Sequence, residues 1–273
     1  IRFSCELNFD INTETQNSIK KNSNRLEILS SERISDEINK ILMCDTPSNG
    51  FKNLEKLNLL NHILPELIDL KGVEEVEGQT HKDNFYHTLE VVDNISRNTE
   101  NLWLRWAALL HDIGKATTKK FSKKVGWTFH GHEFVGSKMV KKIFTRLSLP
   151  LNEKLKYVQK IVMMSSRPIV ISEDIVTDSA VRRLIYDAGN DIDDLLTLCE
   201  ADITTKNIKK SSIYQNNFKI VRKKIKDLEE RDSVRNFQPP ITGEIIMAYF
   251  NIKPCKEIGL IKENIKNAIL DGD

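Results

Sequence analysis

Residues 103–115 of this 273-residue chain, WLRWAALLHDIGK, are the most informative about its fold. The first eight of them are apolar on nearly every side of a helix, as expected for a helix in the middle of a core. The ionisable pair His111 and Asp112 follows directly, and burial of such a pair is unfavourable unless something compensates it. A divalent cation would compensate both groups, because neutral imidazole and carboxylate suit zinc, manganese, iron or nickel. The stretch therefore predicts a buried helix that ends in two metal ligands, with Gly114 giving the local freedom that lets them converge.

Two further residues could reach the same ion. His87 lies in the preceding helical pattern, which begins at Phe85, and could approach from a facing helix. Asp202 lies four residues beyond Leu198 and seven beyond Leu195, which places it on the apolar face of its helix. A bare carboxylate is unfavourable there, and a metal would explain its placement. Taken singly, each has a structural explanation as well, because His87 could satisfy a core hydrogen bond and Asp202 could end a helix.

The composition excludes several classes of protein. With 41 basic and 39 acidic residues the net charge is +2, too small to indicate a nucleic-acid partner by itself. The four cysteines lie far apart without paired spacing, so neither a disulfide framework nor a zinc knuckle is indicated. No stretch approaches the roughly 20 apolar residues of a membrane span, and no secretory signal is present at the start. We expect a cytoplasmic protein without a membrane partner.

The apolar spacing is helical almost throughout, which predicts an all-α chain. Residues 1–75 form a predicted helical module, residues 76–205 a helical bundle that carries the metal ligands, and residues 206–273 a charged helical tail. The one exception lies between Lys119 and His132, where residues 125, 127 and 129 alternate with small or polar ones. This alternation predicts a short hairpin or an extended loop.

The order of the candidate ligands resembles the HD superfamily of metal-dependent phosphohydrolases. The matching pattern is His87, then His111 and Asp112 between Ala-Ala-Leu-Leu and Ile-Gly-Lys, then the distant Asp202. The resemblance implies that these four residues hold a divalent ion that activates water against phosphate mono- or diesters. It also singles out His132, within Gly-His-Glu, as an outer ligand or substrate contact, so that Asp112, Lys115 and His132 are the candidate catalytic residues.

Positive charge follows the HD pattern directly. The side chains that could hold a phosphate or an RNA backbone beside the site are Lys115, Lys119, Lys120, Lys123 and Lys124. A solvated lysine-rich loop is the alternative for all but the first. Ser165 stands where many relatives carry a further histidine, which argues against a second ion and leaves open a non-catalytic module.

The flanks resemble the bacterial CCA-adding tRNA nucleotidyltransferases and their poly(A) polymerase relatives. Residues 1–9, 28–37 and 64–67 are similar to the family's neck, while Pro239 to Gly243 and residues 252–254 are similar to its tail, which meets tRNA. The resemblance implies a complete protein that adds CCA or A to RNA 3′ ends from CTP and ATP, with Mg²⁺ in a head domain. It implies tRNA as a partner; no oligomeric state is predicted.

The head of this family needs a glycine-rich turn followed by paired aspartates on a strand. Asp191 and Asp193 are paired, but they lie in a helical pattern that marks a helix start. The chain also begins at Ile1, in what resembles the middle of an amphipathic helix. We therefore expect a fragment without the head that does not add nucleotides alone. Two alternatives remain: an HD module that serves as a scaffold or RNA-binding body, and a free-standing HD nucleotide phosphohydrolase.

Overall fold

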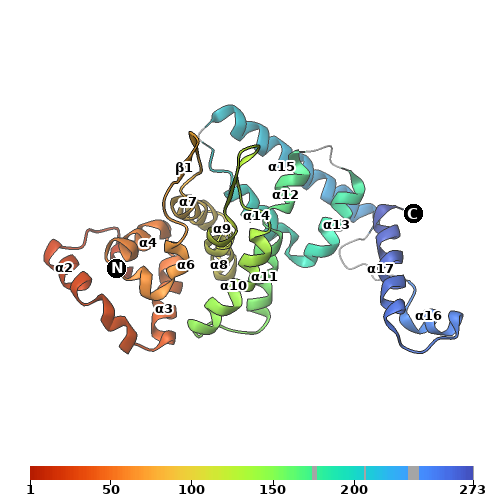
Figure 1. The fold of residues 1–273 in the computed structure, drawn as a ribbon, viewed down its shortest axis with the longest axis horizontal. Helices are drawn as coiled ribbons and strands as arrows, with labels where there is room; N and C mark the ends of the chain where they lie inside the picture. Colours follow the sequence, from red (N-terminus) through yellow and green to blue (C-terminus); the bar gives the residue numbers. More distant parts are fainter. Residues whose placement is uncertain (174–176, 206, 233–239, 273) are drawn as a thin grey trace. The chain divides into compact units, whose positions relative to one another are not determined.

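The computed structural model describes residues 1–173, 177–205, 207–232 and 240–272, and nearly all regular structure in these residues is helical (Figure 1). The predicted all-α class is confirmed. The chain divides into two compact units, of which the first contains Ile1–Ser166 with Asp194–Ser211 and the second Arg167–Asp193 with Ser212–Asp273. The division into neck, bundle and tail at residues 75 and 205 stays a prediction, and Pro239 lies outside the described residues. No helix among the described residues is long and apolar enough to cross a bilayer.

The first unit begins with short helices that bury their apolar faces against one another. Proline occupies the first turn of two of them, Pro47 in α4 and Pro65 in α6, where the missing N–H costs no helical hydrogen bond. Leu42, Phe51 and Leu60 are completely buried among them. In order these elements are α1 (Arg2–Leu7), α2 (Thr13–Lys21), η1 (Ser23–Ile28), α3 (Ser31–Leu42), α4 (Pro47–Lys56), α5 (Leu60–Ile63) and α6 (Pro65–Ile68).

The core of the first unit surrounds α8, whose residues from Leu104 to Leu110 are all buried, as its apolar sequence predicts. Side-chain caps fix where the helices begin: Asp83 accepts hydrogen bonds from the first amides of α7, and Asn101 accepts one from Trp103 of α8. The elements of this core are α7 (Asn84–Ser96), α8 (Leu102–Leu110), α9 (Lys115–Thr118), α10 (His132–Arg146), α11 (Glu153–Met164) and, from Asp194 onward, α14 (Ile192–Ala201).

Arg105 is a buried cation in the middle of α8, only 4% exposed. Its guanidinium donates to the carbonyls of Leu42 and Cys44 at the end of α3, and to those of Ser96 and Thr99 at the end of α7. The last carbonyls of a helix have no partner within the helix, and the planar fork of arginine can satisfy several at once. Arg105 thus ties the ends of two helices to α8.

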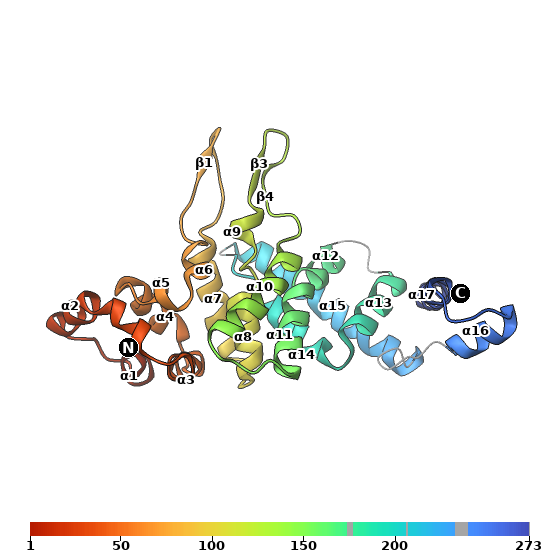
Figure 2. The same ribbon diagram turned by 60° about the horizontal axis from the view of Figure 1, so that its bottom comes forward.

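Two small antiparallel hairpins interrupt the helices, and Figure 2 shows both projecting from the first unit on the same side. The hairpin of β3 (Lys120–Ser122) and β4 (Gly126–Thr128) confirms the prediction from the alternating residues. The hairpin of β1 (Glu75–Val76) and β2 (Gln79–Thr80) was not predicted from the sequence. Strand β2 contacts β4, and Trp127 Nε1 donates to the carbonyl of Gln79 at 3.1 Å.

The regular structure in the described residues of the second unit is entirely helical. Asp178 at the start of α13 pairs with Lys224 at 3.0 Å and with Arg231 at 2.9 Å, both on α15, while Arg183 of α13 pairs with Asp271 of α17 at 2.8 Å. The elements are α12 (Arg167–Glu173), α13 (Asp178–Ala188), η2 (Gly189–Asp191), the greater part of α15 (Ile208–Asp232), α16 (Gly243–Phe250) and α17 (Lys256–Asp271).

Candidate metal centre

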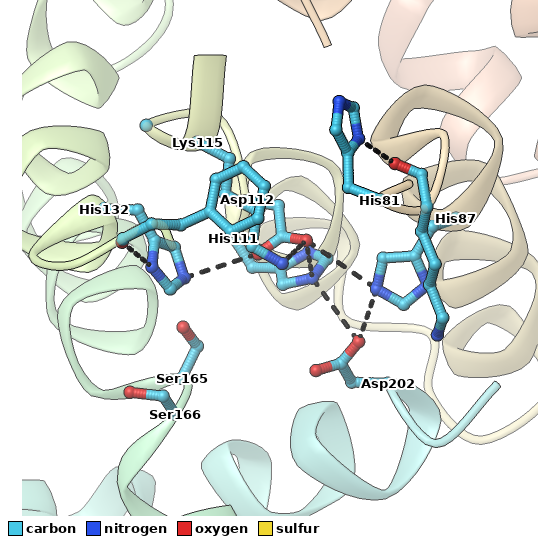
Figure 3. A network of polar contacts seen from close by, with 12 residues as sticks. His81, His87, His111, Asp112, Lys115, His132, Ser165, Ser166 and Asp202 are labelled. Carbon is cyan, nitrogen blue, oxygen red and sulfur yellow. Dashed lines mark hydrogen bonds and ion pairs between the residues drawn. The ribbon is translucent and has the colours of Figure 1, made fainter. Parts of the chain in front are cut away.

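Three segments of the first unit bring the four predicted ligands together (Figure 3). His87 lies in the first turn of α7, while His111 and Asp112 leave the end of α8 in a tight turn. Asp202 follows the last residue of α14. The side chains of His87, His111 and Asp112 are 8%, 3% and 3% exposed, and that of Asp202 is 22% exposed. The cluster is therefore nearly closed, with Asp202 at its open side.

The facing atoms of this cluster are potential ligand atoms. Asp202 Oδ1 lies 2.8 Å from His87 Nε2 and 3.6 Å from His111 Nε2. Ligand atoms of these three residues all lie within 4.8 Å of one another. In spite of this proximity, His111 Nε2 and Asp202 Oδ1 are buried and make no hydrogen bond. Polar atoms buried without partners are unfavourable, and a shared cation would satisfy both, so the residues present fit a metal ion.

The other ring nitrogen of each histidine is held by an oxygen. His111 Nδ1 contacts the carbonyl of Ala108 at 2.8 Å, and His132 Nδ1 contacts the carbonyl of Phe129 at 2.9 Å. Because a carbonyl only accepts, both rings carry hydrogen on Nδ1. His87 Nδ1 lies 3.0 Å from the hydroxyl of Thr204. Such outer contacts orient an imidazole and leave Nε2 available to a metal.

Asp112 uses its two carboxylate oxygens in different directions. Oδ2 lies 3.4 Å from His111 Nε2 and 2.6 Å from Lys115 Nζ, whereas Oδ1 lies 3.5 Å from His132 Nε2. Burial raises the pKa of Asp112, but His111 and Lys115 outweigh burial and hold it well below its ordinary value. Asp112 is therefore an ionised carboxylate that joins the histidine pair to Lys115 and His132.

The charge balance of the cluster also favours a cation. Burial raises the pKa of Asp202, yet the neighbouring imidazoles of His111 and His87 lower it below its ordinary value. Burial lowers the pKa of His111, but the carboxylates of Asp112 and Asp202 raise it to about 10. Two ionised carboxylates thus attract positive charge between the imidazoles. A divalent ion supplies more positive charge there than a single proton on His111 does.

Gly114 contributes to the site differently from the prediction. Its φ of −76° is ordinary for any residue, so conformational freedom is not what it provides. A Cβ at this position would instead lie 2.1 Å from the carbonyl oxygen of His132 and 2.8 Å from the amide of Gly136. The missing side chain allows the turn after α8 to contact the backbone at the start of α10. This close approach brings His132 beside Asp112.

The structure places the other predicted residues around this centre. Lys115 alone among the five lysines contacts a candidate ligand within the described residues. Lys119 pairs with Glu74 at 2.5 Å and Lys123 with Glu77 at 3.3 Å, so both join one hairpin to the other. Lys120 and Lys124 are exposed on the β3–β4 hairpin.

Ser165 and Thr204 complete the surroundings of the site. Ser165 is buried at the end of α11, and its hydroxyl donates to the carbonyl of Val162 at 3.0 Å. Thr204, which the sequence analysis missed, accepts from Lys82 Nζ at 3.3 Å as well as contacting His87. Its position two residues after Asp202 was the available signal, but only tertiary structure brings it to His87.

Comparison with known proteins gives matches along most of the chain. A family model described as "Probable RNA and SrmB- binding site of polymerase A" matches residues 8–70, and the HD domain model matches residues 84–207. The A-adding tRNA nucleotidyltransferase of Deinococcus radiodurans is 28% identical over 98% of this chain and 62% of that protein. The CC-adding tRNA nucleotidyltransferase of Thermus thermophilus is 25% identical over 100% of this chain and 61% of its own length.

A shorter match has higher identity. The multifunctional CCA protein of Pseudomonas fluorescens (strain Pf0-1) is 34% identical over 54% of this chain and 36% of that protein. The chain thus spans less than two thirds of the length of each of these relatives.

Proposed function

We propose that this chain belongs to the family of CCA- and A-adding tRNA nucleotidyltransferases and carries a metal-dependent phosphohydrolase site beside the family's RNA-binding region. The observation that supports the hydrolase most directly is that His111 Nε2 and Asp202 Oδ1 are both buried and neither makes a hydrogen bond. His87, His111, Asp112 and Asp202 would hold one divalent ion. An ion there supplies Lewis-acid activation of a phosphate ester and lowers the pKa of water.

The protein's own groups position the substrate and the proton. Lys115 Nζ lies 2.6 Å from Asp112 Oδ2. Its positive charge would also stabilise a phosphoryl oxygen of the substrate. His132, held through Nδ1 by the carbonyl of Phe129, keeps Nε2 toward Asp112 and could hold a proton there. Asp112, Lys115 and His132 are thus the proposed catalytic residues. Lys119, Lys120, Lys123 and Lys124 would add charge along a bound RNA backbone.

The hydrolase proposal is tested with metal-stripped protein to which Mg²⁺, Mn²⁺, Ni²⁺ or Zn²⁺ is added singly. We expect hydrolysis of a phosphomonoester or of a 2′,3′-cyclic phosphate with at least one ion. Asp112→Asn should abolish it, whereas Asp36→Asn, which removes an exposed carboxylate paired with Lys40, should not. No turnover with any ion would refute the hydrolase and favour an HD module that acts only as a scaffold or RNA-binding body.

For the complete protein we propose addition of CCA or A to tRNA 3′ ends from CTP and ATP, with Mg²⁺ in the head domain. The names of the two relatives that match along the whole chain support this proposal. The family membership argues against a free-standing HD nucleotide phosphohydrolase. Binding of tRNA to this chain should weaken steeply as salt rises, because phosphate contacts release counterions. Absent or salt-independent binding would contradict the RNA-binding assignment.

A further inference from the structure

An aromatic platform borders the metal centre where the two hairpins meet. We define it as the side chains of Trp127, Phe129 and His81. Residues 127 and 129 are two apart on one extended segment, so their side chains share a face. The ring of His81 lies edge-on to both, 5.0 Å from Trp127 and 6.0 Å from Phe129 between centroids. Aromatic groups from both hairpins therefore converge at one place, and all three rings remain partly exposed.

The platform opens toward the proposed phosphate site. A pocket of about 350 Å³ is lined by Trp127 and Phe129 and also by Lys115 and His132. Lys115 and His132 are the two groups that lie against the opposite oxygens of Asp112. One open pocket thus joins aromatic surface to the residues proposed to handle the phosphate.

Cations accompany the rings of the platform. Lys115 Nζ lies 5.7 Å from the centroid of Phe129, and Lys119 Nζ lies 5.6 Å from that of Trp127. Aromatic faces combined with lysine charge are the groups that proteins use for nucleobases and their phosphates. The carbonyl of Phe129 also holds His132 Nδ1, so the same residue shapes the pocket and orients a site histidine.

The ring of Trp127 has a fixed orientation before any ligand binds. Its Nε1 donates to the carbonyl of Gln79 at 3.1 Å, and Phe121 packs against it at 5.3 Å between centroids. Two-stranded hairpins are marginal alone, so this cluster also holds the hairpins together. A purely structural cluster would need the contact with Phe121 but would not need Phe129 and Lys115 in an open pocket beside Asp112.

We propose that the platform stacks the base of a nucleoside phosphate whose phosphate group lies at the metal centre. Trp127 and Phe129 are then specificity-determining residues that favour nucleotides or an RNA terminus over other phosphate esters. The location of the phosphate rests on the proposed hydrolase, whereas the recognition of the base does not.

The kinetic experiment compares adenosine 5′-monophosphate with ribose 5-phosphate, which has the same ester linkage but no base. Phe129→Leu and Trp127→Leu should lower kcat/KM for the nucleotide by on the order of tenfold, through KM. Neither variant should change kcat/KM for the sugar phosphate. Phe134→Leu, the matched control, removes an exposed ring that does not line the pocket and should leave the preference for the nucleotide intact.

A binding experiment separates this inference from the hydrolase proposal. Calorimetric titration of metal-free protein with adenosine should show binding that Phe129→Leu weakens on the order of tenfold. If this holds while neither ester is hydrolysed, the platform stands and the hydrolase fails. If adenosine does not bind and the wild-type protein hydrolyses both esters equally well, the platform is refuted and the hydrolase stands. A loss of kcat/KM that is equal for both esters in Phe129→Leu also refutes it.

Discussion

Replacement of Thr204 with valine tests whether the histidines are oriented to bind a metal. The change keeps the branched shape of the side chain and removes the hydroxyl that lies 3.0 Å from His87 Nδ1. Without that contact, the ring of His87 can rotate, and its Nε2 no longer keeps a fixed direction toward the cation. Asp202 Oδ1, 2.8 Å from Nε2, then faces a ring with no fixed orientation.

The expected magnitude follows from the single contact that is lost. A neutral hydrogen bond contributes about 0.5–1.5 kcal/mol, which corresponds to a change of about two- to thirteenfold in affinity. Loss of an outer contact to a metal-bound histidine typically costs about 10- to 100-fold in metal affinity. Because Thr204 is partly exposed and water could replace part of the contact, we expect the overlap of these ranges, about tenfold.

Isothermal titration of metal-stripped protein with Zn²⁺ or Mn²⁺ measures this affinity. Thr205→Val is the matched control, since the Thr205 hydroxyl accepts a long hydrogen bond, 3.4 Å, from the amide of Asn207 and makes none to His87 among the described residues. The control should bind metal as the wild type does. Unchanged affinity in Thr204→Val, with circular dichroism showing an intact fold, would refute the assignment of His87 as an oriented ligand.

Three further predictions concern the backbone, the core and the charge of the site. Gly114→Ala forces a Cβ to within 2.1 Å of the His132 carbonyl and should lower the free energy of unfolding by about 1–3 kcal/mol in thermal melts, whereas Gly259→Ala, which meets nothing within 4 Å, should not lower it. Arg105→Met leaves four backbone carbonyls without their donor and should destabilise the protein by at least about 3 kcal/mol in denaturant titrations; a smaller loss would contradict its role. Because the pKa of His111 is raised to about 10, the metal-free protein should lose stability as pH rises from about 6.5 toward 10. For the same reason, metal binding at pH 7 should release about one proton from His111. Calorimetry in buffers of different ionisation enthalpy measures this release. Zero proton release would contradict the protonated state of His111.

Much of the site was predictable because a buried charge is unfavourable unless an opposite charge or hydrogen bonds compensate it. An apolar helix that runs into His111 and Asp112 requires compensation, and a carboxylate at Asp202 on an apolar face requires it too. These constraints can be read from spacing, and the structure brings His87, His111, Asp112 and Asp202 together as the spacing suggested.

The missed features depend on contacts between distant segments. The β1–β2 hairpin has strands of two residues and turns at Glu77 and Gly78, both with positive φ, so no alternation marked it. It contacts Trp127, which lies 48 residues beyond Gln79 in the sequence. The function of Gly114 was misjudged for the same reason, because its neighbour across the contact is the backbone of His132. The local sequence pattern indicates which residues stand in unexpected positions. Their contacts depend on the tertiary structure.

The most direct test of the metal centre is an anomalous diffraction map from crystals of this protein grown with Zn²⁺ or Mn²⁺. We expect one peak, about 2.0–2.2 Å from Nε2 of His87 and of His111 and from carboxylate oxygens of Asp112 and Asp202. The peak should disappear in His111→Ala crystals under the same conditions. No peak at this position, or an ion held there without these side chains, would contradict the account.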